Sequence, residues 1–324
     1  MSLFRSNLNI SIKSIDDLIR CLCLASLLEL AGWPKPGNVH RTKDFENTKF
    51  EHFLAGIAAI QPTFMDFCKK LFQLPFKNQV DFEKIELGQF FKDAAEEMMN
   101  WQSGGNVLLG HILILAPLAA ATIICLKSKD YSFYDWKNNL GMVIENTSVN
   151  DTVKLYEAIK LCNPGGLGTV EKYDLNKENS VKEIIQENIK LKKIFELSKE
   201  RDLISLEYAN NFNIILNEGV PYFLKIYSQY NDINCAIVNT YLKLLSLHPD
   251  TLVIRKSGSD FALNISKKAS HILDRGGIST DQGFKLALEL DNELQEKKGK
   301  LNPGTTADLL SGIIFCALVF GLRI

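Results

Sequence analysis

The residues best suited to chemistry in this sequence are four aspartates, each of which stands at or near the start of an expected helix. They are Asp44, Asp151, Asp250 and Asp308. An aspartate in this position can cap its helix by accepting hydrogen bonds from the first backbone N–H groups. It can also bind Mg²⁺, which prefers oxygen ligands and commonly bridges to substrate phosphates. Because each lies beside a loop that suits a phosphate, we expect the four to converge on one or two Mg²⁺ ions.

The proline-rich stretch from Glu29 to His40 interrupts the helices, and we interpret it as the stretch around which the rest of the chain is organised. Its two prolines and two glycines end the preceding helix, since proline lacks a backbone donor and restrains its neighbour. Lys35, Asn38 and His40 give the loop a cation and hydrogen-bonding groups, so it could hold an anionic ligand. The alternative interpretation is an ordinary interhelical turn with solvated charges.

Two further breaks, Gly104-Gly105-Asn106 and Pro303-Gly304-Thr305-Thr306, lead directly into apolar helices. Free N–H groups at the start of a helix bind anions, and glycine lets a phosphate come close. Neither break has the Walker pattern or a Rossmann fingerprint. Arg255 and Lys256 follow another break and, together with Lys35, could neutralise a polyphosphate. Each of these cations could equally be a surface charge.

Apolar residues recur at helical spacing along most of the chain, and no run alternates well enough to predict a sheet. The expected helices cover residues 15–30, 49–60, 63–72, 87–102, 107–126, 133–147, 151–160, 202–216, 221–230, 233–247, 262–273, 280–296 and 309–322. Residues 177–198 are highly charged and predict a linker or a solvated helix. The sequence therefore predicts an all-α fold of roughly ten to thirteen helices, with residues 1–324 as a single globular domain.

One expected helix, Val107 to Leu126, is about as long as a membrane span and nearly uncharged. It contains His111 and Pro117, and a helix that is apolar all round is also typical of the centre of a large helical protein. We therefore predict a buried core helix, a core role for His111 and no membrane partner. Leu309 to Leu322 is another buried helix by the same argument.

The composition sets further limits. A formal net charge of −1 over 324 residues lacks the basic excess of a nucleic-acid-binding protein. The seven cysteines lie mostly in apolar runs and are interpreted as core residues in a reducing compartment, which predicts a cytoplasmic protein. The expected partners are small-molecule nucleotides, and a homodimer is left open.

Several motifs, in order along the chain, resemble those of the triphosphoribosyl-dephospho-CoA synthase family. They are Glu29 followed by Pro34-Lys35-Pro36-Gly37-Asn38-Val39; His40 and Asp44; Asn106 and Gly110; Asp250-Thr251 with Arg255-Lys256 and Gly258; and Pro303-Gly304-Thr305-Thr306-Ala307-Asp308-Leu309-Leu310. The resemblance covers most of the chain and implies an all-helical enzyme.

The activity that the resemblance implies uses ATP as a substrate. Adenine leaves C1' of ATP, and the ribose 2'-hydroxyl of 3'-dephospho-CoA takes its place. Breaking an N-glycosidic bond builds positive charge on the ribose, which carboxylates such as Asp44 and Asp308 would stabilise. Glu29 or His40 would accept the proton of the attacking hydroxyl, while Asn38 and Asn106 would orient the nucleotide. The cations would steady the phosphates.

The sequence departs from the family pattern at two places. Asn106-Val107-Leu108-Leu109-Gly110 lacks the threonine, histidine and lysine that the family carries between its ends, and residues 163–168 differ from the lyase-linked enzymes. The chain resembles the divergent archaeal branch, so the acceptor is open. Two alternatives are another Mg²⁺-dependent nucleotide-using transferase or phosphohydrolase in methanopterin-type cofactor synthesis, and a non-catalytic helical nucleotide-binding protein.

Overall fold

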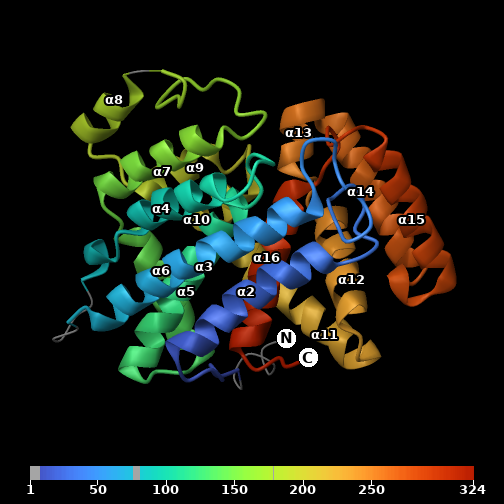
Figure 1. The fold of residues 1–324 in the computed structure, drawn as a ribbon, viewed down its shortest axis with the longest axis horizontal. Coiled ribbons are helices and arrows are strands. Elements are labelled where there is room, and N and C mark those ends of the chain that lie inside the picture. Colours follow the sequence, from blue (N-terminus) through green and yellow to red (C-terminus); the bar gives the residue numbers. More distant parts are fainter. Residues whose placement is uncertain (1–7, 76–80, 178) are drawn as a thin grey trace.

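The computed structural model describes residues 8–75, 81–177 and 179–324. Within these ranges the chain is built from helices, and its extended pairing is limited to two isolated bridges, Asn9 with Ser132 and His40 with Lys43. The all-α prediction is confirmed. Figure 1 shows long helices crossing the centre of the molecule and shorter ones around its rim.

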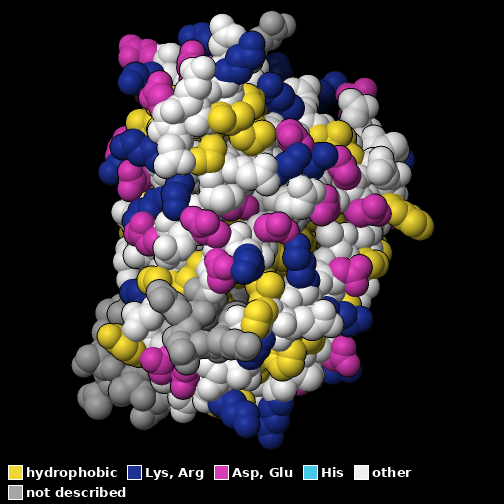
Figure 2. Space-filling view, turned by 90° about the vertical axis from the view of Figure 1, so that its left-hand side faces the viewer, with side chains coloured by type: hydrophobic (Ala, Val, Ile, Leu, Met, Phe, Trp, Pro, Cys, Tyr) yellow, Lys and Arg dark blue, Asp and Glu magenta, His cyan; other side chains and the backbone are white. Residues whose placement is uncertain are grey.

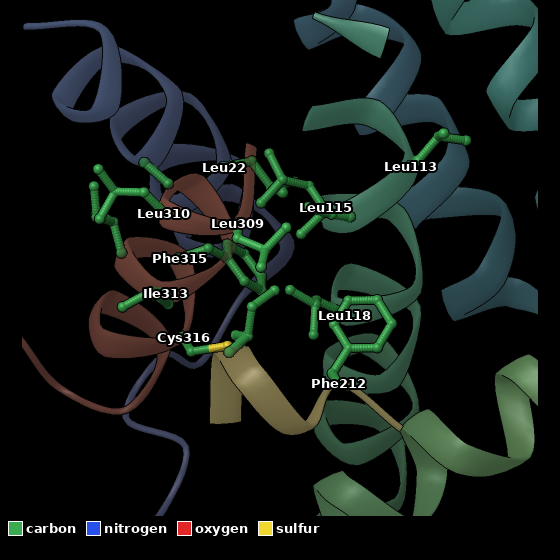
Figure 3. Close-up of a cluster of buried hydrophobic side chains, with 14 of the residues drawn as sticks. Leu22, Leu113, Leu115, Leu118, Phe212, Leu309, Leu310, Ile313, Phe315 and Cys316 are labelled. Atoms are coloured by element: carbon green, nitrogen blue, oxygen red, sulfur yellow. The ribbon is translucent and has the colours of Figure 1, made fainter. Parts of the chain in front are cut away.

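Three helices form the centre. They are α2 (Ile15–Ala31), α5 (Leu109–Ser128) and α16 (Gly304–Val319). Nearly every residue of α5 and α16 is buried, because both helices are apolar on all sides and are covered by neighbours. Figure 3 shows their leucine, isoleucine and phenylalanine side chains meeting those of α2. Although α5 is long and apolar enough to cross a membrane, 94% of its apolar window is buried inside the protein, as expected for a core helix.

Four helices pack beside this centre, at the left of Figure 1: α3 (Phe50–Gln73), α4 (Leu87–Asn100), α6 (Phe133–Glu145) and α7 (Val149–Cys162). The prediction of two helices across residues 49–72 was wrong, since α3 runs straight through Pro62. The apolar face on both sides of this proline is buried, at Ile57, Ile60, Phe64 and Phe67. That burial outweighs the backbone hydrogen bond that the proline cannot donate.

The segment from residue 177 to 219 is more broken than predicted. It forms α8 (Ser180–Gln186), α9 (Leu191–Ser198), α10 (Leu203–Ala209) and the π-helix η2 (Ile214–Gly219). The helix expected over residues 202–216 is interrupted because Asn211 and Phe212 both have positive φ angles. Buried Glu207 bridges the interruption by accepting hydrogen bonds from the N–H groups of Ile214 (2.8 Å) and Ile215 (2.9 Å).

The remaining helices lie at the right of Figure 1. They are α11 (Val220–Tyr230), α12 (Ile233–Leu247), α13 (Thr251–Ser257), α14 (Ser259–Asp274) and α15 (Asp281–Gln295). Short 3₁₀ turns, η1 (Phe82–Ile85) and η3 (Gly277–Ser279), complete the described elements.

The two ends of the described chain lie together at the bottom of Figure 1. The backbone N–H of Ser11 donates to the carbonyl of Val319 (2.9 Å), and the Arg323 guanidinium donates to the Ser11 hydroxyl (3.2 Å). At the left-hand face of the molecule, basic and acidic side chains are interspersed (Figure 2), as on an ordinary solvated surface.

Candidate functional site

A cavity of about 250 Å³ lies where the starts of α5, α13 and α16 face α7, α9 and α10. Four residues singled out from the sequence line it: Asn106, Arg255, Thr305 and Asp308. The lining also includes apolar residues such as Leu109, Leu155, Ile159, Ile194 and Phe195. The cavity therefore joins breaks of the chain that are about 200 residues apart (308 − 106 = 202), and its lining combines polar and apolar side chains.

Asp308 is the central acid of this cavity. Its side chain is 21% exposed, and within the described residues neither carboxylate oxygen accepts a hydrogen bond. Gly110, at the start of α5, allows the close approach, since a Cβ on this residue would run into the Asp308 carboxylate. Burial raises the pKa of Asp308 well above its ordinary value. Nearby carboxylates raise this pKa further; they are Glu29, Asp250 and Asp202.

Behind Asp308 lies a buried chain of ionisable groups. His111 Nε2 is 3.7 Å from an Asp308 carboxylate oxygen and 3.4 Å from one of Glu29. The other Glu29 oxygen pairs with the Lys35 ammonium, which also donates to the Glu29 carbonyl (2.7 Å). Burial opposes ionisation of Glu29, but Lys35 and His111 outweigh it, so the pKa of Glu29 is lowered. His111 Nδ1 lies 3.2 Å from the Ser26 hydroxyl, which is the last member of this chain of buried polar groups.

The proline-rich loop is held in place by residues that the sequence did not single out. Asp291 of α15 accepts hydrogen bonds from the backbone N–H of Gly37 and lies 3.0 Å from His40 Nε2. The hydroxyl of Tyr241 accepts a hydrogen bond from Asn38 (2.6 Å) and donates to the carbonyl of Pro36 (2.8 Å). His40 and Asn38 are thus engaged in fixing the loop, and neither lines the cavity.

Asp250 joins the start of α13 to the start of α16. One carboxylate oxygen accepts from the N–H groups of Leu252 and Val253, as a helix cap does. The other accepts from the backbone N–H (2.7 Å) and hydroxyl (2.8 Å) of Thr306. Beside it, the Thr251 hydroxyl donates to that of Thr305 (3.4 Å). Asp250 therefore positions the helix that carries Asp308, and it lies outside the cavity wall.

The cationic edge of the cavity is formed by Arg255 and by Arg201, a residue that no sequence motif indicated. Arg255 Nη1 donates to Asp202 Oδ1 (2.9 Å), and its buried Nε has no hydrogen-bond partner among the described residues. The glycine loop over residues 165–168 packs directly on these cations: a Cβ on Gly166 would lie 2.8 Å from Arg255 Cβ. Lys256 is exposed and reaches the carbonyl of Gly299 (3.4 Å).

The other predicted residues lie apart from the cavity. Asp151 accepts hydrogen bonds from the N–H groups of Gly88 and Ser148, which ties α7 to α4. Exposed Asp44 accepts from the N–H of Phe50 (2.8 Å), and Gly304 packs against Leu252.

The four aspartates are not gathered into one cluster. Among residues 8–75, 81–177 and 179–324, no group of three or more His, Cys, Asp or Glu side chains is arranged to hold a metal ion. The physical reason is that the carboxylates of Asp44, Asp151 and Asp250 are occupied by backbone N–H groups, whereas that of Asp308 is open to the cavity.

Comparisons with known proteins identify the family of this chain. A family model described as ATP:dephospho-CoA triphosphoribosyl transferase matches residues 15–323. A crystal structure from Archaeoglobus fulgidus, named as a triphosphoribosyl-dephospho-CoA synthase, is similar with a TM-score of 0.62 and 28% identity, covering 83% of this chain and 100% of that one.

Curated relatives are similar over a shorter stretch. The "Probable 2-(5''-triphosphoribosyl)-3'-dephosphocoenzyme-A synthase" of Salmonella gallinarum is 27% identical over 105 residues, as is a protein of Salmonella typhimurium with the same name followed by "1". The matched stretch covers 32% of this chain and 34% of each relative. Because the family model spans nearly the whole chain, we conclude that the chain belongs to the ATP:dephospho-CoA triphosphoribosyl transferase family.

Proposed function

We propose that this protein transfers the 5-triphosphoribosyl group of ATP to the ribose 2'-hydroxyl of 3'-dephospho-CoA or a related acceptor, with release of adenine. The proposal is supported by family membership and by one observation above all: Asp308, an acid with a strongly raised pKa, lines a cavity beside a buried His–Glu–Lys chain. The polar residues of the lining suit a triphosphate and a ribose. The apolar residues suit a base or the uncharged part of an acceptor.

We assign proton acceptance to Asp308. The acceptor's 2'-oxygen forms its bond to C1' of ATP while the bond from C1' to the adenine nitrogen breaks. The proton of the hydroxyl passes to the Asp308 carboxylate, which later returns it to solvent. The electron pair of the broken bond leaves with adenine, which takes up a proton from solvent. A base with a raised pKa is better suited to this step than Glu29, whose pKa is lowered by Lys35 and His111 despite its burial.

His111 supports this step from behind. With Nε2 within 4 Å of carboxylates of both Asp308 and Glu29, the imidazole can donate to either one. Such contact would steady the negative charge of Asp308 before the proton arrives, and Glu29 with Lys35 fixes the imidazole in place. His111 is thus a positioning residue in this proposal, whereas the sequence had predicted only a core histidine.

Arg255 and Arg201 are proposed to hold the triphosphate. Both line the cavity, and Arg255 keeps one buried N–H without a partner among the described residues. Guanidinium groups match phosphate geometry well and stay charged. Asn106 and Thr305 also line the cavity and add neutral hydrogen-bonding groups. The side chain of Asn106 already accepts a hydrogen bond from the N–H of Leu109.

Mg²⁺ is also part of the proposal. Negatively charged carboxylates, including that of Asp202, surround Asp308, and Lys35 offsets their charge only in part. The oxygen atoms at this site therefore suit a cation that enters with the nucleotide. Asp308, whose carboxylate accepts no hydrogen bond among the described residues, would contribute an oxygen to it, since Mg²⁺ is usually bound through one or two carboxylates plus substrate phosphates. When bound, the ion would neutralise charge on the triphosphate.

The direct test is to incubate the protein with ATP, Mg²⁺ and 3'-dephospho-CoA and to analyse the products by mass spectrometry. We expect free adenine and a product whose mass is that of the two substrates less adenine, and neither with Asp308→Asn. Release of pyrophosphate or phosphate without adenine would show a different reaction. ATP binding without any product over a panel of acceptors would instead favour a non-catalytic nucleotide-binding protein. The buried thiols fit a reducing cytoplasm, where these substrates would be met.

A further inference from the structure

A second concave site lies between α11 and α12, two helices at the lower right of Figure 1. It is a groove of about 830 Å³, within the range of roughly 300–1,000 Å³ typical of small-molecule sites. It shares no lining residue with the cavity that holds Asp308. Any ligand of the groove is therefore separate from the proposed transfer reaction.

The groove has apolar walls. Pro221 and Leu224 on α11 face Leu244 and Leu247 on α12. Their spacing of three residues on each helix places each pair on one helical face. Leu247 is 48% exposed, so this apolar surface is open to solvent. Walls of this kind suit a hydrocarbon chain or ring.

Two ammonium groups stand along these walls without a counter-charge. Lys225 and Lys243 line the groove, and in the described part of the chain neither side-chain ammonium makes an ion pair or a hydrogen bond. The one acid in the lining, Glu218, is engaged by His248 at 2.8 Å. A ligand seated here would therefore meet a net positive charge.

Two buried oxygen atoms of the lining residues also lack partners. The hydroxyl of Thr240, a residue with 0% exposure, and Oδ1 of Asn217 have none among the described residues. A threonine or serine within a helix normally satisfies itself on the carbonyl four residues earlier, as Thr122 and Ser266 do in this chain. Thr240 does not, and a buried polar group without a partner costs about 1–3 kcal/mol.

We propose that this groove binds a small amphipathic anion, with an apolar body between α11 and α12 and a carboxylate or phosphate head near Lys225 and Lys243. The Thr240 hydroxyl supplies a further polar contact. The π-helix η2 forms one end of the groove through Asn217 and Gly219, and such distortions of a helix are frequent at functional sites. A second copy of this chain is a poorer occupant, because the same face would bring two more lysines rather than acids.

The test uses decanoate as the probe, at concentrations below its micelle threshold, with binding measured by isothermal titration calorimetry. We expect one decanoate per chain and weaker binding of decanol and of decyltrimethylammonium, which lack the negative charge. The double variant Lys225→Gln/Lys243→Gln is expected to lose about tenfold in affinity. Thr240→Val, which keeps the shape of the side chain, is expected to weaken binding less.

Lys285→Gln is the matched control, because Lys285 is an exposed lysine on α15, remote from the groove lining. Equal affinity of decanoate for the wild type and the double variant, equal binding of decanol, or no binding at all would overturn the proposal. Light scattering tests whether the groove is instead an interface between two copies of the chain. If the protein is a dimer and Leu247→Glu converts it to a monomer, the groove is such an interface and the proposal is wrong.

Discussion

At the scale of single residues, Asp308 and Asp151 show that aspartates near the starts of helices can have different environments in the folded protein. Both lie near the start of a helix, so the sequence predicts helix capping or Mg²⁺ binding for both. The difference lies in the neighbouring helix: α4 presents the N–H of Gly88 to Asp151, whereas α5 presents Gly110, with no side chain, to Asp308. Sequence patterns cannot distinguish these cases, because the partner is supplied from a distant part of the chain.

The first prediction concerns the charge of Asp308. Asp308→Asn keeps the shape of the side chain and removes the proton acceptor, so we expect adenine release to fall by at least about 100-fold. The same change should keep or raise the melting temperature, since a carboxylate with a raised pKa is costly to ionise in the folded protein. Activity assays and thermal unfolding at pH 7 check both expectations. Adenine release near the wild-type level would show that Asp308 does not take part in the reaction.

The second prediction concerns the buried pair of Lys35 and Glu29. Lys35→Met should destabilise the protein by about 3–5 kcal/mol, because it leaves the Glu29 carboxylate buried without its cation. The double variant Glu29→Gln/Lys35→Met should lose much less. Urea unfolding at pH 7 of the wild type, of the single variants Lys35→Met and Glu29→Gln, and of the double variant measures the difference. If the double variant is as unstable as the sum of the two single variants, the pair contributes no coupling energy.

At the scale of elements, helix starts and faces were largely predictable. Ser14 caps α2 as its position suggests, and the buried faces of α4 and α12 follow their apolar periodicity. The errors came where tertiary contacts override local signals, as at Pro62 in α3. The cavity was only half predictable: its helix-start residues carry recognisable motifs, but Arg201 and Asp202 do not.

The third prediction separates structural aspartates from functional ones. Asp151→Ala should lower stability by about 1–3 kcal/mol, since it leaves the N–H groups of Gly88 and Ser148 without their acceptor. Activity per folded molecule should stay near the wild-type level, because Asp151 does not line the cavity. Unfolding by urea and adenine release by the folded fraction are the two measurements. A loss of activity without a loss of stability would show that Asp151 acts in the functional site.

The fourth prediction concerns the carboxylate that holds η2. Burial raises the pKa of Glu207 to about 8, despite its hydrogen bonds from Ile215 and Ile214. An acid with a raised pKa in the folded state binds more protons there than when unfolded, so it makes stability fall as pH rises from its ordinary range towards 8. Glu207→Gln should flatten this part of the pH profile of the free energy of unfolding. If Glu207→Gln leaves the slope of the free energy of unfolding between pH 5 and pH 8 unchanged, this prediction is wrong.

At the scale of the whole molecule, the central helices and most of the rim share one hydrophobic core, which extends from Ile10 to Leu322. A smaller apolar cluster around Tyr156 and Ile184 lies under α8. This shared core supports our proposal that residues 1–324 form a single domain. The sequence motifs could suggest that interpretation but not the packing that supports it.

The fifth prediction follows from that shared core. Equilibrium unfolding in urea should show one cooperative transition, with the same midpoint by tryptophan fluorescence and by circular dichroism. The three tryptophans are suitable probes because Trp33 lies near α12, Trp101 follows α4 and Trp136 lies in α6. Two separated midpoints would show that the chain is divided into independent units.

The contact between Ser11 and Val319 has a practical consequence for protein engineering. Val319 ends α16, and Asp308 lies eleven residues earlier (319 − 308 = 11), which is about 16 Å along the helix axis at the usual rise per residue. A short Gly–Ser linker could therefore join the segments that carry Ser11 and Val319 without obstructing the cavity. A circularly permuted chain, reopened at the exposed turn around Asn188, would then place a fluorescent reporter beside α9 and convert ligand entry into an optical signal.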